Sequence, residues 1–235
     1  MAMGKFILNR PDDHKFYSRK EIIWITVKWF FLLWFCAIAL RVLCVAVYMG
    51  MGVNPMEQTK FLGDPTTHMD HVNGWMLLHF MLVAPLAEEL MFRLGLSFRR
   101  YGVALWAGLL PLICTYYLFG CKNWLVLLVL ILLVGVIFWL VCRYTTNEQW
   151  AHWRTRFIVP AMWVSAIAFG LIHFKAFSVL NVQVFPFALA TVLVPMAGGC
   201  AITYARVNLG FWYGVALHCI MNIPAVLMLA SALPH

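Results

Sequence analysis

Seven long apolar runs constrain the fold of this chain more than any other feature of its sequence. Each run has about twenty residues, the length at which an α-helix crosses the hydrocarbon core of a membrane. Charged residues make up only 11% of the 235 residues, whereas a soluble domain has about 25%. The sequence therefore predicts an all-α, polytopic helical bundle in a membrane, with about seven transmembrane helices. The runs cover residues 22–47, 74–98, 101–118, 124–141, 157–174, 183–204 and 210–232.

The segments between the runs suggest one membrane domain, residues 21–235, after a basic N-terminal segment, residues 1–20. We expect polar loops at 49–73 and 145–156. Proline often opens a helix, so we expect Pro160 to begin the fifth helix. Pro195 and the pair Gly198–Gly199 predict an interruption of the sixth helix,. A further short or re-entrant helix would fit residues 177–184.

The distribution of Lys and Arg predicts the orientation. If the N-terminus lies in the cytoplasm, twelve basic residues fall on that side and three on the other, which agrees with the positive-inside rule. The twelve are Lys5, Arg10, Lys15, Arg19, Lys20, Arg93, Arg99, Arg100, Arg143, Arg154, Arg156 and Arg206, and the three are Lys60, Lys122 and Lys175. The net charge of +8 therefore reflects membrane flanks, and we expect no nucleic-acid partner but contact with a lipid bilayer.

The second apolar run contains an unusual charged group, Glu88, Glu89 and Arg93. Ionisable residues inside a membrane are costly and mark functional sites by default. Glu89 and Arg93 are four residues apart and can pair on one helix face. Glu88 is rotated by about 100° from Glu89, so it can face a different partner. One carboxylate is thus expected to be held internally and the other to be available for chemistry.

Three further polar residues lie at a matching depth in other runs. Counting about 1.5 Å per residue places Glu88 about 18 Å from the cytoplasmic end, His173 about 20 Å, His218 about 12 Å and Asn222 about 18 Å. Taken singly, a His or Asn in such a helix is more often an interhelical hydrogen-bond partner, and we interpret His79 in that way. Four polar groups at similar depth instead favour a shared polar cavity.

These side chains suit the attack of water on a carbonyl group. A carboxylate in a low-dielectric pocket can act as a general base near neutral pH. His173 could hold the water, and His218 with Asn222 could donate hydrogen bonds to a developing oxyanion. A Glu with two His could also bind a metal, so that alternative stays open. The loop residues His68, Asp70 and His71 do not have the spacing of a strong zinc site, and we interpret them as solvated polar residues.

The motifs E-E-x-x-x-R (Glu88, Glu89, Arg93), F-x-x-x-H (Phe169, His173) and H-x-x-x-N (His218, Asn222) occur in this order. In this they resemble the CAAX protease and bacteriocin-processing (CPBP/Abi) family of intramembrane glutamic proteases, and the chain looks similar to type II CAAX prenyl endopeptidases. The resemblance covers about residues 84–224.

The resemblance implies a catalytic role for Glu88 with His173, and an oxyanion site formed by His218 and Asn222. It implies a supporting role for Glu89 and Arg93, with no obligatory metal and no cofactor. The substrate would be a membrane-associated peptide or protein, such as a prenylated tail or a bacteriocin-like leader.

The chain departs from the family pattern in the distance between two motifs. Residues 94–172, 79 in number, separate Arg93 from His173, and they contain an apparent inserted helical hairpin at about 101–142. Two extra crossings return the chain to the same side of the membrane, so the later motifs keep their orientation and the site can still assemble. The resemblance implies an intramembrane endopeptidase. The short length and the lack of a recognisable organelle signal favour a bacterial plasma membrane as the expected location. The alternative is a non-proteolytic membrane scaffold or immunity protein that regulates a sensor kinase or protects against a bacteriocin.

Overall fold

The computed structural model describes residues 18–54, 73–118, 120, 122–177 and 180–230. Within these residues the chain is almost entirely helical and has no β-strand, which confirms the all-α fold. The second predicted run is one continuous rod in which α4 and α5 are joined by a π-helical segment, His79–Val83. The helices are α2 (Arg19–Gly50), α4 (Gly74–Leu78), α5 (Ala84–Arg93), α6 (Arg100–Ile113), α7 (Trp124–Tyr144), α8 (Asn147–Leu171), α9 (Phe185–Asn208) and α10 (Phe211–Ala230).

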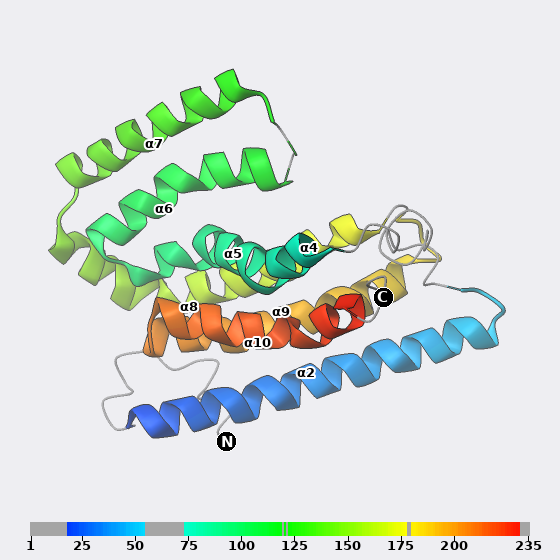
Figure 1. Cartoon of the computed structure of the whole chain (residues 1–235). Helices are drawn as coiled ribbons and strands as arrows, with labels where there is room; N and C mark the ends of the chain where they lie inside the picture. Colours follow the sequence, from blue (N-terminus) through cyan, green and yellow to red (C-terminus); the bar gives the residue numbers. More distant parts are fainter. Residues whose placement is uncertain (1–17, 55–72, 119, 121, 178–179, 231–235) are drawn as a thin grey trace.

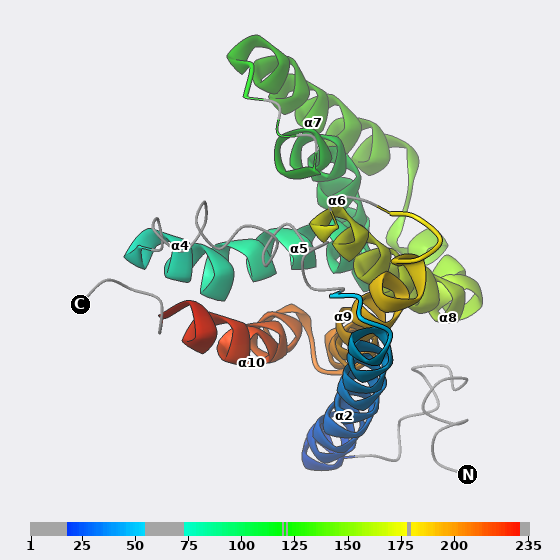
Figure 2. The same cartoon turned by 90° about the vertical axis from the view of Figure 1, so that its right-hand side faces the viewer.

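Helix α9 is the central element of the bundle. It contacts α2, α8 and α10, while α5 contacts α8 and α10. Figure 1 shows α2 running along one side of the molecule and the α6–α7 hairpin standing on the opposite side. In Figure 2 the α4–α5 rod and α10 lie side by side and extend to the left of the other helices. Two of the helices that carry motifs, α8 and α10, therefore pack against α9, and α5, which carries the third, packs against both of them.

Small residues let the helices approach α9 closely. A side chain at Gly199 would meet Phe169 of α8, and one at Gly198 would meet Met221 of α10. On α8, a side chain at Gly170 would meet Met196 of α9. Close contact through small residues is the usual way that helices associate in membranes.

Five helical segments are long and apolar enough to cross a membrane, by length and composition. They support a multi-pass, membrane-embedded protein. The apolar part of α10, Phe211–Leu227, is shorter, and α6 with its π-helical continuation is the other remaining predicted span. The five segments are Arg19–Gly50, Gly74–Ser97, Trp124–Tyr144, Asn147–Ala176 and Phe185–Asn208.

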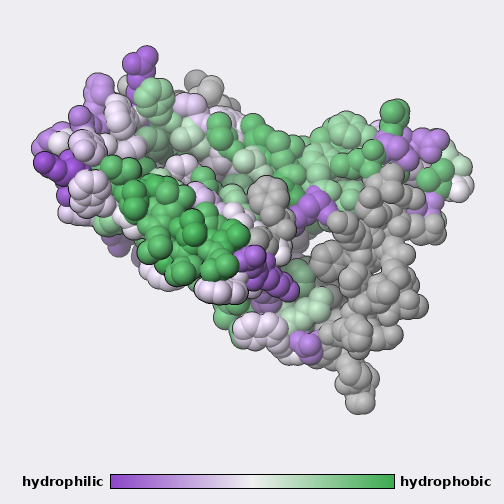
Figure 3. Space-filling model, turned by 90° about the horizontal axis from the view of Figure 1, so that it is seen from above, coloured by the Kyte–Doolittle hydropathy of each residue, from purple (hydrophilic) through white to green (hydrophobic). Residues whose placement is uncertain are grey.

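One end of the bundle carries most of the basic residues that the structure describes, and we call it the basic end. Here α2, α6, α8 and α10 begin and α7 and α9 end, as Figure 1 shows at its left side. Hydrophilic residues also gather at the left in Figure 3, whereas hydrophobic residues cover much of the middle. The arrangement agrees with the asymmetry of charge expected from the sequence. The basic end includes Arg19, Lys20, Arg99, Arg100, Arg143, Arg154, Arg156 and Arg206.

Several predicted boundaries were wrong. Most of the expected polar loop at 145–156 is helical, because Thr146 and Gln149 form a capping box that begins α8 at Asn147,. Pro160 consequently lies inside α8 and does not begin it. Helix α9 also continues through Pro195 and both glycines without interruption.

The remaining differences concern the chain between the spans. The described part of 177–184 is a turn and not a helix. Arg19 and Lys20 already belong to α2, whose capping box is formed by Ser18 and Glu21. Residues 1–17 of the basic segment lie outside the described residues, as do His68, Asp70 and His71.

Candidate functional site

Glu88, Glu89 and Arg93 lie in α5, and side chains from neighbouring helices fix the end of this helix. The indole Nε1 of Trp106 in α6 donates to the carbonyl oxygen of Met91 at 2.7 Å. The hydroxyl of Ser165 in α8 donates to the carbonyl oxygen of Phe92 at 2.9 Å. Carbonyl groups at a helix C-terminus lack partners within the helix. These two side chains therefore fix the end of α5 that carries the motif.

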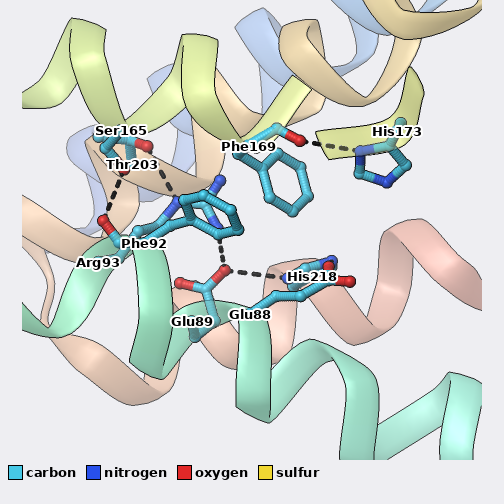
Figure 4. A network of polar contacts seen from close by, with 9 residues as sticks. All are labelled: Glu88, Glu89, Phe92, Arg93, Ser165, Phe169, His173, Thr203 and His218. Carbon is cyan, nitrogen blue, oxygen red and sulfur yellow. Dashed lines mark hydrogen bonds and ion pairs between the residues drawn. The ribbon is translucent and has the colours of Figure 1, made fainter. Parts of the chain in front are cut away.

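Glu89 and Arg93 form the predicted ion pair, and both side chains are fully buried. The Arg93 Nε donates to Oγ1 of Thr203 in α9 at 3.0 Å. The guanidinium carbon lies 4.3 Å from the centre of the Phe169 ring, within the range of a cation–π interaction. Arg93 thus connects α5 with both α8 and α9, as Figure 4 shows. The prediction that one carboxylate is held internally is confirmed.

His218 lies between the two carboxylates. Its Nδ1 is 2.9 Å from Oε1 of Glu89, and its Nε2 is 3.4 Å from Oε2 of Glu88. The His218 side chain is buried, whereas that of Glu88 keeps 12% of its surface exposed. A neutral imidazole carries one N–H and one lone pair. The cluster therefore needs one proton beyond the neutral ring for His218 to donate to both carboxylates at once.

His173 is positioned by the turn that follows α8. It lies in the 3-10 helical segment Ile172–Ala176, and its Nδ1 is 2.8 Å from the carbonyl oxygen of Phe169. A carbonyl oxygen only accepts, so Nδ1 carries the hydrogen, and in the neutral ring Nε2 is an acceptor. The Phe169 ring is 5.2 Å from both His173 and His218, edge-on to each. Figure 4 shows His173 beside this cluster.

Asn222 makes a contact that the sequence did not predict. Its Nδ2 donates to the carbonyl oxygen of Phe80 at 2.9 Å. Phe80 belongs to the π-helical segment before α5, and such segments often occur at functional sites. An amide group has two hydrogens to donate, so this contact uses one and leaves the second for another acceptor. Asn222 thereby ties α10 to the rod that carries Glu88.

The structure brings Glu88, Glu89, Arg93 and His218 into one network, with His173 adjacent to it. The catalytic roles assigned to these residues stay predictions. Sequence reasoning missed the bridging position of His218, because helical spacing relates residues only within one helix. It also missed Thr203. The sequence signal for Thr203 was its position as the only Ser or Thr in residues 198–206, which begin with Gly198 and Gly199.

Two largely apolar cavities lie beside this network. One, of about 380 Å³, is formed by α2, α8 and α9 and reaches Thr203. The other, of about 740 Å³, is formed mainly by α5, α6 and α8 and reaches Phe92 and Ser165. Among the residues that the structure describes, no three His, Cys, Asp or Glu side chains gather in a way that could hold a metal ion.

Comparisons of the chain with family models, curated proteins and solved structures found no match. Function is therefore inferred from the geometry of the network and from the motifs in the sequence.

Proposed function

We propose that the protein is an intramembrane endopeptidase in which Glu88 activates a water molecule to hydrolyse a peptide bond. One observation carries this proposal. Of two adjacent carboxylates within an apolar bundle, Glu89 is fully buried and paired with Arg93, while Glu88 is partly exposed and lies beside His218. A second carboxylate next to a paired one is costly in a membrane, and a catalytic role explains why it is present.

The proposed chemistry uses the side chains around Glu88. Glu88 takes a proton as the water oxygen bonds to the carbonyl carbon, and it later delivers a proton to the leaving amine. The Nε2 of His173 accepts a hydrogen bond from the water. His218 and the second amide hydrogen of Asn222 stabilise the oxyanion. The Glu89–Arg93 pair holds His218 in position, and the mechanism uses no cofactor or obligatory metal.

The substrate class and location belong to the same proposal. The substrate is a membrane-associated peptide or protein, such as a prenylated tail or a bacteriocin-like leader. The site lies in a bacterial plasma membrane with the basic end in the cytoplasm. The resemblance of the three motifs to the CPBP/Abi family and the excess of Lys and Arg at one end support these assignments,.

The deciding experiment compares peptide termini in membranes from cells that express the wild-type chain, Glu88→Gln or Glu148→Gln at equal levels. Glu148 is an exposed glutamate in the first turn of α8 and serves as the matched control. We expect new termini with the wild type and with Glu148→Gln, but none with Glu88→Gln. Thermal unfolding of each purified variant verifies that the chain remains folded.

The same experiment tests the alternative. If the three strains give identical termini and Glu88→Gln still supports the cellular role of the protein, proteolysis is rejected. A non-proteolytic scaffold or immunity protein would then account for the chain.

A further inference from the structure

Three arginines from three different elements come together at the basic end. Arg99 precedes α6, Arg154 lies in the second turn of α8, and Arg206 lies in the last turn of α9. They are not part of the network around His218. We call Arg99, Arg154 and Arg206 the arginine cluster.

The packing of the chain before α6 brings the cluster together. The 3-10 segment Leu94–Ser97 contacts both α8 and α9. It ends at Phe98, whose left-handed backbone (φ 45°) turns the chain and whose ring centre is 6.4 Å from that of Trp150 in α8. Arg154 follows Trp150 by one helical turn, on the same face. From α9, Nη2 of Arg206 reaches the carbonyl oxygen of Leu94 at 3.5 Å.

The positive charges in this cluster are not balanced by an ion pair within the described part of the chain. The contacts of Leu94–Ser97 with α8 and α9 place like charges at the point where these elements meet, and like charges repel one another. The buried carboxylate of Glu89 is already paired with Arg93 and His218. The ion pairs of the network around His218 include none of the three arginines.

Burial makes this arrangement unusual for a membrane flank. Arg206 is only 8% exposed, whereas flanking arginines normally extend into water. The buried Nε atoms of Arg206 and Arg154 have no hydrogen-bond partner among the described residues. Buried donors of this kind cost free energy when they stay unpaired. The cluster thus combines like charges with unused donors, and an anion bound to its guanidinium groups would neutralise the charges.

We propose that the arginine cluster binds the phosphate group of an anionic phospholipid. Guanidinium groups recognise phosphate oxygens through paired, charge-assisted hydrogen bonds. The cluster lies at the end of the spanning helices α8 and α9, where headgroups meet the protein. Basic groups between transmembrane helices at this level are typical of sites for anionic headgroups. The site is separate from the proposed peptidase chemistry and stands without it.

Lipid titration followed by native mass spectrometry tests this site. The full chain, in a neutral maltoside detergent, is titrated with phosphatidylglycerol, with phosphatidylcholine and with inorganic phosphate. We expect saturable binding of phosphatidylglycerol and much weaker binding of phosphatidylcholine, which is zwitterionic. Arg154→Gln and Arg206→Gln should each weaken phosphatidylglycerol binding about tenfold or more, because each removes charge-assisted hydrogen bonds. Arg143→Gln, an exposed arginine at the end of α7 on the same side, should leave it unchanged.

The outcomes separate the sources of the anion. Equal binding of both phospholipids would overturn the site as proposed. An Arg143→Gln variant that loses as much affinity for phosphatidylglycerol as the cluster variants would also overturn it. If inorganic phosphate binds saturably and phosphatidylglycerol does not bind, the ligand is a free anion and the proposed lipid site is rejected. If Arg206→Gln does not fold, the half-buried Arg154→Gln decides the question.

Discussion

The Nδ1 of His218 lies 2.9 Å from Oε1 of Glu89, and the same carboxylate oxygen accepts from Arg93. This single oxygen therefore joins α10 to α5, and Arg93 extends the connection to Thr203 in α9. Three helices meet through charged groups that are shielded from solvent. Such groups are stabilising only as a complete set, because each becomes an uncompensated buried charge when its partner is lost.

Removing Arg93 should destabilise the protein strongly. In Arg93→Met the buried Glu89 loses its cationic partner, and we expect the free energy of unfolding to fall by about 3–5 kcal/mol. SDS titration of the protein in detergent micelles measures the change. Arg143→Met, which alters an exposed arginine, is the control and should change stability by less than about 0.5 kcal/mol.

The double variant Glu89→Gln with Arg93→Met tests the cause of this effect. Removing both charges avoids the unpaired carboxylate, so the double variant should be more stable than Arg93→Met alone. A double variant that is less stable by the full sum of the two single changes would mean that the residues act independently.

Thr203 should contribute to stability through the hydrogen bond of its hydroxyl group and not through the packing of its side chain. In Thr203→Val the buried Nε of Arg93 loses its acceptor, and we expect a loss of about 1–3 kcal/mol. Thr203→Ser keeps the oxygen and should retain most of the stability. Because Arg93 holds Glu89, the Val variant should also reduce the formation of the new peptide termini. Equal stability of the Val and Ser variants would show that the hydroxyl makes no contribution.

Gly199 should tolerate no larger side chain. A Cβ atom there would lie 2.8 Å from Cδ1 of Phe169 and 3.2 Å from Nη2 of Arg93. Gly199→Ala should therefore cost about 1–3 kcal/mol through overpacking. Gly135→Ala is the matched control, because Gly135 lies in α7 with nothing within 4 Å of its added Cβ. Alanine favours the helix there, so the control should be neutral or stabilising by up to about 1 kcal/mol.

These contacts show why the sequence predicted some features of the fold and not others. The spans follow from the length of the apolar runs, and the Glu89–Arg93 pair follows from the spacing of residues within one helix. Both were predicted. Gly198 and Gly199 were expected to interrupt α9, but their small size serves contacts with Met221, Phe169 and Arg93. That role depends on neighbouring helices, which the local sequence does not specify.

The start of α8 shows a second limit. Residues 147–156 are polar, and polarity alone predicted a loop. The hydrogen bonds of Thr146 and Gln149 instead begin a helix well before its apolar part. The capping-box pattern T-x-x-Q was present in the sequence,. The position of His218 between two carboxylates had no comparable signal, because it depends on how α10 packs against α5.

The topology predicts where fused reporters will be active. Helix α2 begins at the basic end, and α10 begins there and ends at the opposite side. With the basic end in the cytoplasm, the two chain termini should lie on different sides of the membrane. Green fluorescent protein should fluoresce at the N-terminus, and alkaline phosphatase should be active at the C-terminus. Phosphatase activity of a fusion at the N-terminus would show that the protein has the opposite orientation in the membrane.

Asn222 allows a test that separates packing from catalysis. Its amide donates to the carbonyl oxygen of Phe80, so Asn222→Leu should lower stability by about 1 kcal/mol. If its second hydrogen stabilises an oxyanion, cleavage should fall about 100-fold or more, far beyond the effect of this loss of stability. Asn222→Gln keeps both donors on a longer side chain and should restore part of the activity. Full cleavage by Asn222→Leu, measured as the yield of new termini, would confine Asn222 to packing against the π-helical segment and remove it from the proposed mechanism.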